Sequence, residues 1–252
     1  MLWTQICTQA TSLAERNPRL NGYLSSIILD FDDLTTAISY HLHRALSGHA
    51  HGAELNGWFS DVMQSQPSIV NATECDLRKL VSVNPACPDE LTGLLAFRGI
   101  LALTSQRISH QIWQEGDRQS AVLLQNWASQ QWNIDIHPAA RMGKGLFVDH
   151  GIGIVIGETA IVEDDVSIWH GVTLGSTLTE AGDRHPKIGR GALICANATV
   201  LGNITVGAGS IVAANSVVTK PVPERVIVAG CPAKVIADVP AELDTLTSKT
   251  VK

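Results

Sequence analysis

The sequence predicts an α+β protein, with an N-terminal all-α domain in residues 1–130, a parallel β-helix in residues 131–237 and a C-terminal tail in residues 238–252. Apolar residues recur at helical intervals in the first part, and aliphatic residues recur every six positions in the second. A six-residue period is typical of a β-helix of hexapeptide repeats, because each repeat supplies one short strand and one turn. A polar interruption of this period predicts one extruded loop.

The helical pattern of the first part is interrupted once by prolines. It is carried by residues 3–17, 31–48, 91–116 and 118–132. In the second of these segments, one apolar stripe consists of Leu34, Ile38, His41, Leu42 and Leu46. Gly48 follows this stripe, and glycine is typical of helix ends. Two prolines in residues 83–90 break the pattern, since proline cannot continue a helix. We therefore expect several short helices.

The six-residue period of the second part is neither a helical nor an alternating strand pattern. Each strand would point one aliphatic side chain into a narrow prism, so that stacked coils bury a continuous apolar column. The repeated positions are Ile156, Val162, Ile168 and Leu174, then Ile188, Ile194, Val200, Val206, Val212 and Val218. An earlier run, offset by two extra residues, is Ile136, Met142, Val148 and Ile154.

The register breaks between Leu174 and Ile188, where the sequence reads GSTLTEAGDRHPK. A polar segment with arginine and histidine, extruded from a rigid solenoid, is a candidate active-site loop. From the residues alone, a solvated turn insertion explains the segment equally well.

Composition narrows the function classes. The chain has 252 residues, is 45% hydrophobic and 17% charged, and carries a net charge of −6, which argues against a nucleic-acid surface. We expect no secretory signal, and no apolar stretch approaches the roughly 20 residues that span a bilayer. The five cysteines are scattered and lack CxxC spacing, which argues against disulfides or structural zinc and favours a cytoplasmic protein.

Several motifs carry a resemblance to a known family. DIHP begins at Asp135, VDH ends at His150, GDRHP begins at Gly182, and AISYHLHRAL and QNWASQQW lie in the helical part. With these motifs, residues 2–236 resemble the bacterial and plant serine O-acetyltransferases. The resemblance implies a left-handed β-helix that forms trimers, with active sites between subunits, and a helical domain that pairs trimers into a hexamer. It also implies acetyl transfer from acetyl-CoA to serine, the committed step toward cysteine, without a metal.

The reaction requires a base, because a primary hydroxyl is a poor nucleophile near neutral pH. Histidine suits this task, and a carboxylate partner would fix its tautomer and stabilise the imidazolium. By resemblance, His150 is the catalytic base and Asp135 its partner. Taken without the motif, His150 is a polar residue at the end of a strand.

The resemblance also assigns residues that bind the substrate serine. Asp149 matches a residue that binds the amino group, and Arg184 and His185 match residues that hold the carboxylate, for which a guanidinium is well shaped. Glu158, in the GETA segment, is either a residue that supports this site or an exposed turn residue.

Coenzyme A is expected in a groove between adjacent β-helices. The positions that match the pantetheine site are Gly175, Ser176, Ala196 and Ala214. Small residues there let the thioester approach the backbone, although tight coils need small residues in any case. Lys220 and Lys234 are candidate phosphate contacts.

The chain departs from the family at several positions that bear on the acceptor. Asn84 replaces an aspartate that helps to bind the serine ammonium, and Asp89 is a nearby substitute. Trp169 and His170 stand where the family usually has an aliphatic residue and glutamine. The register places His170 against His150 on the next coil, so His170 is a candidate substrate-binding residue.

Two further departures concern the acyl donor and a partner enzyme. Ser176 replaces a glycine beside the expected thioester position. The chain ends in Lys252 rather than the isoleucine with which family members usually dock into cysteine synthase, which argues against that complex.

Other functions remain open at this stage. The acceptor is serine or another hydroxy amino acid such as homoserine, and the donor is acetyl-CoA or another acyl-CoA such as succinyl-CoA. A non-catalytic regulatory or scaffold homologue is an alternative of another class. A zinc site like that of the gamma-class carbonic anhydrases needs two histidines five residues apart, and no pair among His137, His150, His170 and His185 has this spacing.

Overall fold

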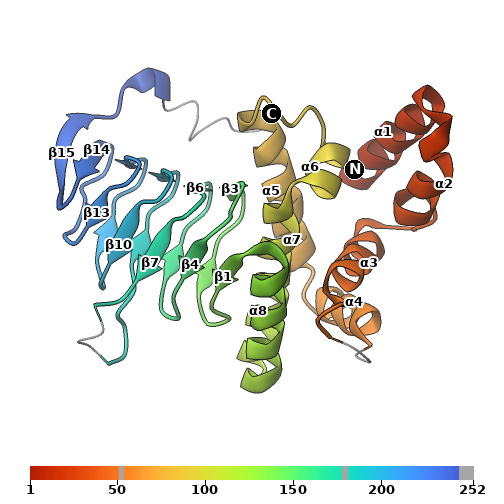
Figure 1. Cartoon of the computed structure of the whole chain (residues 1–252), viewed down its shortest axis with the longest axis horizontal. Helices are drawn as coiled ribbons and strands as arrows, with labels where there is room; N and C mark the ends of the chain where they lie inside the picture. Colours follow the sequence, from red (N-terminus) through yellow and green to blue (C-terminus); the bar gives the residue numbers. More distant parts are fainter. Residues whose placement is uncertain (51–53, 178–180, 244–252) are drawn as a thin grey trace.

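The computed structural model describes residues 1–50, 54–177 and 181–243 (Figure 1). Helices form one half of the molecule and a parallel β-helix forms the other, which confirms the predicted fold class. The helices are α1 (Leu2–Arg16), α2 (Asn21–Leu24), α3 (Leu34–Leu46), α4 (Leu55–Ser65), α5 (Ser68–Val83), α6 (Glu90–Ala96), α7 (Arg98–Gln114) and α8 (Arg118–Trp132). Short helical turns occupy Pro18–Leu20, Ser25–Leu29 and Ala241–Leu243. The domain limits at residues 130 and 237 stay a prediction.

The helical patterns in the sequence predict most of these elements. Helix α3 buries its entire predicted stripe, from Leu34 to Leu46, and ends directly after it. The prolines of residues 83–90 lie between α5 and α6. The expected helical run 91–116 is divided, because Phe97 adopts an extended backbone between α6 and α7. Helix α7 then packs closely on the β-helix, since a side chain at Gly99 would lie 2.9 Å from the carbonyl oxygen of Val148.

The β-helix has three faces, and each coil gives one strand to each face. Sheet A contains β1 (Ile134–Ile136), β4 (Ile154–Ile156), β7 (Thr173–Gly175), β10 (Thr199–Leu201) and β13 (Val217–Val218). Sheet B contains β2 (Arg141–Met142), β5 (Ile161–Val162), β8 (Lys187–Ile188) and β11 (Thr205–Val206). Sheet C contains β3 (Phe147–Asp149), β6 (Ser167–Trp169), β9 (Leu193–Ile194), β12 (Ile211–Val212), β14 (Val226–Gly230) and the antiparallel β15 (Ala233–Asp238).

The six-residue register proves correct in the pairing of the strands. Val148 pairs with Ile168, Ile168 with Ile194, and Ile194 with Val212, so equivalent positions stack from coil to coil. The predicted aliphatic positions are buried, except that Met142 is half-buried. The predicted extruded segment lies between β7 and β8; residues 178–180 fall outside the described residues, and its described parts lie at the lower edge of the β-helix in Figure 1.

A buried ion pair fastens the helices to the first coil. The Asp76 carboxylate on α5 accepts a hydrogen bond from Arg107 on α7 at 2.6 Å and another from the backbone N–H of Leu146 at 2.8 Å. Arg107 also donates to the carbonyl oxygen of Gly143 at 2.7 Å. Because every partner lies in a packed junction, the helical half and the β-helix are held in one fixed arrangement.

Candidate active site

One corner of the β-helix carries a column of predicted site residues. This corner, which we call the base corner, is formed by the turns that lead from sheet C to sheet A and consists of His150, His170, Ala196 and Ala214. Each lies two residues after a stacked core position of sheet C. The predicted base and two predicted coenzyme A contacts therefore share one edge of the solenoid.

His150 lies in an unusual turn of the base corner. Its φ is 53°, and its side chain is 72% exposed. The Nε2 atom lies 3.9 Å from the Asp149 carboxylate. Two extra residues lengthen this turn, because Val148 pairs with Ile168 twenty residues later whereas Ile194 pairs with Val212 eighteen residues later. The result is an accessible imidazole beside a carboxylate, an arrangement that suits proton transfer.

His170 stands next to His150, as the register predicts. The two rings have centroids 6.1 Å apart and an interplanar angle of 72°, which is an edge-to-face contact. Within the described part of the chain, the buried Nδ1 atom of His170 has no hydrogen-bond partner. Trp169, directly before it, packs beside a small cluster formed by Cys195, Ile211 and Val239 on the outer face of sheet C.

Asp135 lies in the middle of β1, in sheet A, rather than in a turn of the base corner. Its carboxylate accepts a hydrogen bond of 2.6 Å from the side-chain amide of Gln125 on α8. The predicted pairing of Asp135 with His150 thus stays a prediction, and the contact with Gln125 was not foreseen.

The opposite edge of sheet A carries the second group of predicted residues. This edge, which we call the anion corner, is formed by the turns from sheet A to sheet B and includes Glu158, Thr159, Ser176, Arg184, His185 and Lys220. The Arg184 guanidinium donates to the Glu158 carboxylate at 2.7 Å, and this hydrogen bond lowers the pKa of Glu158. The extruded loop therefore folds back onto the preceding coil.

His185 is buried in the anion corner, only 6% exposed. Its Nδ1 atom accepts a hydrogen bond from the backbone N–H of Thr159 at 3.2 Å, which leaves the ring proton on Nε2. Burial, and then the nearby Arg184 charge, lower the pKa of His185. Both effects favour the neutral imidazole, which can donate from Nε2.

His137 is a further histidine of this corner that the sequence assigned to no site. Its Nδ1 atom accepts from the backbone N–H of Ala139 at 3.0 Å, so that it also keeps its proton on Nε2. Burial lowers its pKa, while the Glu158 charge opposes this shift. The ring packs edge-on against Trp113, with centroids 5.1 Å apart. The DIHP motif was the available signal.

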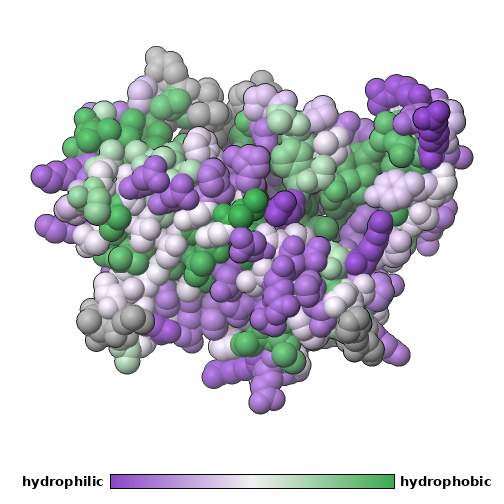
Figure 2. All heavy atoms as spheres, viewed as in Figure 1, coloured by the Kyte–Doolittle hydropathy of each residue, from purple (hydrophilic) through white to green (hydrophobic). Residues whose placement is uncertain are grey.

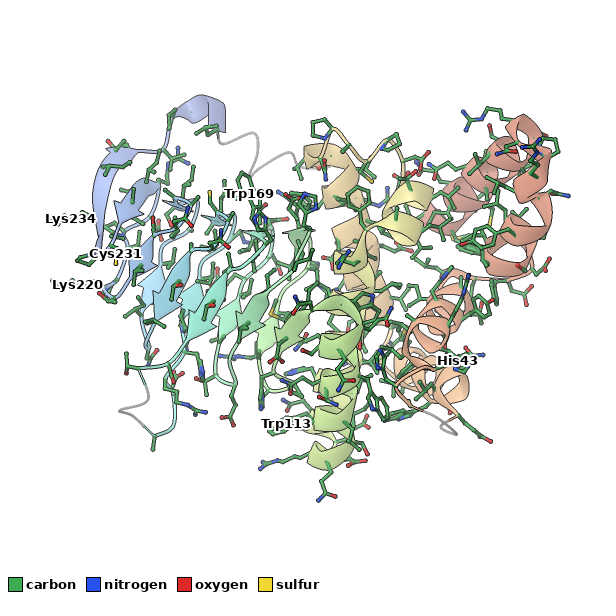
Figure 3. The ribbon with its side chains drawn as sticks, in the orientation of Figure 1. His43, Trp113, Trp169, Lys220, Cys231 and Lys234 are labelled. Atoms are coloured by element: carbon green, nitrogen blue, oxygen red, sulfur yellow. The ribbon has the colours of Figure 1, made fainter. Side chains whose placement is uncertain are left out.

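An open cavity of about 350 Å³ lies beside the anion corner and is lined in part by Trp113, Arg118, Arg141, Glu158 and Lys187. Figure 3 shows Trp113 at the lower edge of the β-helix and Trp169, the neighbour of His170, at the upper edge. The two corners are thus separated by the strands of sheet A, which at three residues span roughly 10 Å. Serine is shorter than one such strand.

The other predicted residues lie outside the base corner and, except for Lys220, outside the anion corner. Asn84 ends α5 and accepts from the backbone N–H of Ala86 at 3.0 Å, while Asp89 caps α6 by accepting from Thr92 N–H at 2.8 Å. Lys220 and Lys234 are exposed, and both lie at the end of the β-helix that is farthest from the helices (Figure 3). The C-terminal residues, including Lys252, lie outside the described residues.

The coenzyme A positions differ in exposure. Ala196 is half-buried and Ala214 is exposed on the base corner, while Gly175 and Ser176 are half-buried at the end of β7. A Cβ atom at Gly175 would lie 3.0 Å from the side chain of Leu201, so close packing is a sufficient reason for this glycine.

The described residues offer neither a metal site nor a membrane-spanning helix. They contain no group of three histidine, cysteine, aspartate or glutamate side chains placed to hold a metal ion. None of their helices combines the length and the apolar character needed to cross a membrane.

Figure 2 shows apolar atoms near the lower end of α8, the helix on which Val122 and Leu123 are exposed.

Known proteins resemble this chain over nearly its full length. Residues 2–105 match the family model of the serine acetyltransferase N-terminal domain, and residues 185–220 match the bacterial transferase hexapeptide model. The serine acetyltransferase of Haemophilus influenzae is 42% identical, over 94% of this chain and 89% of that protein. A solved serine acetyltransferase in complex with cysteine is 41% identical and superposes with a TM-score of 0.93, covering 97% of this chain and 96% of that one. Another, from Brucella abortus in complex with coenzyme A, is 39% identical, has a TM-score of 0.91 and covers 95% and 96%.

Proposed function

The chain belongs to the serine acetyltransferase family, and from this premise we propose that His150 is the base with which it acetylates serine. The enzyme is a serine O-acetyltransferase that takes its acetyl group from acetyl-CoA. The observation that carries the assignment of the base is the exposed His150 imidazole beside the Asp149 carboxylate. An exposed ring can exchange protons with a substrate, which a buried ring with both nitrogens occupied cannot do.

The reaction is a single acyl transfer. The serine hydroxyl gives its proton to a ring nitrogen of His150 as its oxygen attacks the thioester carbonyl carbon. The carbon–sulfur bond then breaks, and the coenzyme A thiolate takes the proton back from the imidazolium. Asp149 binds the serine ammonium and Asp135 stabilises the charged ring, while Gln125 holds the Asp135 carboxylate in position.

The serine carboxylate is bound at the anion corner. Arg184 supplies a guanidinium and His185 an Nε2–H donor, and Glu158 holds Arg184 in place. Asn84 and His170 complete the acceptor pocket, with no negative charge at position 84. Coenzyme A runs along Gly175, Ser176, Ala196 and Ala214 toward Lys220 at the end of the solenoid.

The active site lies between two copies of the chain. One copy gives its base corner and the next gives its anion corner, since the strands that separate the two corners of one chain are longer than serine. Repetition of this head-to-tail contact closes a trimer, and the helical domains pair two trimers into a hexamer. The enzyme works in the cytoplasm.

A thiol-release assay tests the proposed substrates. Acetyl-, succinyl- and longer acyl-CoAs are crossed with serine, homoserine and threonine, and the highest kcat/KM is expected for acetyl-CoA with serine. A strong preference for another pair would overturn the proposed substrates. An absence of turnover with every pair would favour the scaffold alternative.

Mixed oligomers test whether the site is shared. The variants His150→Ala and His185→Ala are each expected to be nearly inactive, but random co-assembly should leave about a quarter of the interfaces with both intact corners. Activity should therefore return when the two variants are co-refolded. If co-refolded oligomers of verified mixed composition remain as inactive as the separate variants, the two corners do not form one site.

A further inference from the structure

We propose that Thr159 is a positioning residue for the serine carboxylate site, because it holds the backbone of Arg184 and His185 and keeps the His185 proton on Nε2. This inference rests on the proposed function of those two residues. Thr159 belongs to the GETA segment on the turn after β4, and Arg184 and His185 belong to the extruded loop one coil later.

The Thr159 hydroxyl binds two consecutive backbone amides. The backbone N–H groups of Arg184 and His185 each donate to Thr159 Oγ1 at 3.0 Å. One oxygen atom thus fixes the backbone positions of both residues that hold the substrate carboxylate. Lys187 supports the same arrangement, because its ammonium donates to the carbonyl oxygen of Thr159 at 2.8 Å and to that of His185 at 2.7 Å. We call the surroundings of the His185 ring, formed by Gly157, Thr159 and Lys187, the seat of His185.

Thr159 also determines which ring nitrogen of His185 carries the proton. Its backbone N–H points at Nδ1, at 3.2 Å, so Nδ1 must be an acceptor. Because Oγ1 already accepts two amides, its own proton is free to be donated, and Nδ1 lies 2.9 Å away. The Asp183 carboxylate is a second acceptor for this proton, since Lys187 first and Thr159 to a smaller degree lower the pKa of Asp183.

The ring seat is also shaped on its other side. A Cβ atom at Gly157 would overlap the imidazole ring of His185, near Nε2 and Cδ2. The GET sequence of residues 157–159 therefore serves the substrate carboxylate in three ways: Gly157 leaves space for the ring, Glu158 binds Arg184, and Thr159 orients both loop residues.

The test compares Thr159→Val, which keeps the shape but removes the hydroxyl, with Thr159→Ser, which keeps the hydroxyl. In Thr159→Val the KM for serine is expected to rise roughly 10-fold, because two backbone amides lose their acceptor, while the KM for acetyl-CoA stays unchanged. Thr159→Ser should retain the wild-type KM for serine. Thermal unfolding and oligomer size serve as controls of folding, and Thr159→Ala replaces Thr159→Val if the latter does not assemble.

The pH dependence separates positioning from a general loss of structure. In the wild type, burial and the Arg184 charge lower the pKa of His185, which favours the neutral ring. Loss of the seat should let the pKa of His185 rise, so that a larger fraction of the ring takes a proton as the pH falls from about 8 to about 6. A protonated Nδ1 would face the N–H of residue 159 and leave the seat. The ratio of wild-type to Thr159→Val kcat/KM for serine should therefore grow as the pH falls.

The outcomes separate this inference from the proposed function. If the wild type does not acetylate serine, or if His185→Asn leaves the KM for serine unchanged, the proposed function fails. If those controls behave as expected but Thr159→Val keeps a serine KM within about twofold of wild type, the positioning inference fails. It also fails if the KM values for serine and acetyl-CoA rise together with no change in the pH dependence.

Discussion

The histidines at the two corners of sheet A have opposite environments. His150 on the base corner is 72% exposed in the single chain, with the Asp149 carboxylate at 3.9 Å and the edge-on ring of His170 beside it. His185 on the anion corner is 6% exposed, and its Nδ1 atom is held by Thr159. The same side chain is thus left accessible on one edge of the solenoid and held in one tautomer on the other.

The difference follows from the chemistry of the two tasks. A general base must accept a proton and release it in each turnover, so at least one of its nitrogens must be reachable. A residue that binds a carboxylate must always present a donor, so a fixed tautomer is an advantage. Burial and the Arg184 charge lower the pKa of His185, which disfavours its protonation and leaves the Nε2–H donor in place. Each corner can be disturbed separately to test this division.

The largest effect is expected from the base corner. His150→Ala should lower kcat by about 10²- to 10⁴-fold, because it removes proton transfer from the transition state. The KM for acetyl-CoA should change little, since the coenzyme A positions on this corner keep their side chains. Steady-state thiol-release kinetics measure both values.

Coenzyme A binding is the control for this variant. Calorimetry of His150→Ala with coenzyme A should give the wild-type Kd, which shows that the groove is intact. Near-normal turnover of His150→Ala would disprove the role of His150 as the base.

The next effect is expected from the anion corner. Gly157→Ala should raise the KM for serine by about 10- to 100-fold, because the new Cβ atom displaces the His185 ring and a hydrogen bond to a charged group is lost. The KM for acetyl-CoA should remain close to wild type. The same kinetic assay, with serine varied, checks this result.

Gly57→Ala is a matched control for this substitution. A Cβ atom at Gly57, in α4, has no atom within 4 Å, so this variant should keep wild-type kinetics. A normal serine KM in Gly157→Ala would mean that the ring can move without cost, and that the seat does not position it.

The sequence predicts the repeated parts of this molecule better than its unique contacts. The six-residue register is set by buried aliphatic side chains, and it correctly placed His170 beside His150. The contact between Gln125 and Asp135 depends on how α8 packs on β1, which no local pattern encodes. The pairing of Arg184 with Glu158 depends on how the extruded loop folds back, and its sequence contains no repeat that fixes this path.

The division of residues 91–116 into α6 and α7 has the same cause. The helical pattern breaks at Phe97, a residue type that does not itself end helices. Its extended backbone is explained by the close packing of α7 on β3, where Gly99 lies against Val148. Tertiary packing thus overrides a helical pattern. The roles of Asp149, Asn84 and the coenzyme A positions rest on the family resemblance and stay predictions.

The smallest effect is expected from the pair of rings on the base corner. An edge-to-face contact of two rings contributes about 0.5–1.5 kcal/mol, so His170→Gln should lower kcat by roughly 2- to 10-fold by letting the His150 ring turn. His170→Phe keeps a ring at this position but lacks Nδ1, the buried atom that has no partner among the described residues. If the ring contact orients His150, His170→Phe should keep more of the wild-type kcat than His170→Gln. If both variants lose activity equally, the nitrogen rather than the ring is what matters, and His170 then belongs with the groups that bind the acceptor. If both retain the wild-type kcat and the wild-type preference for serine over homoserine, the base corner works through His150 alone.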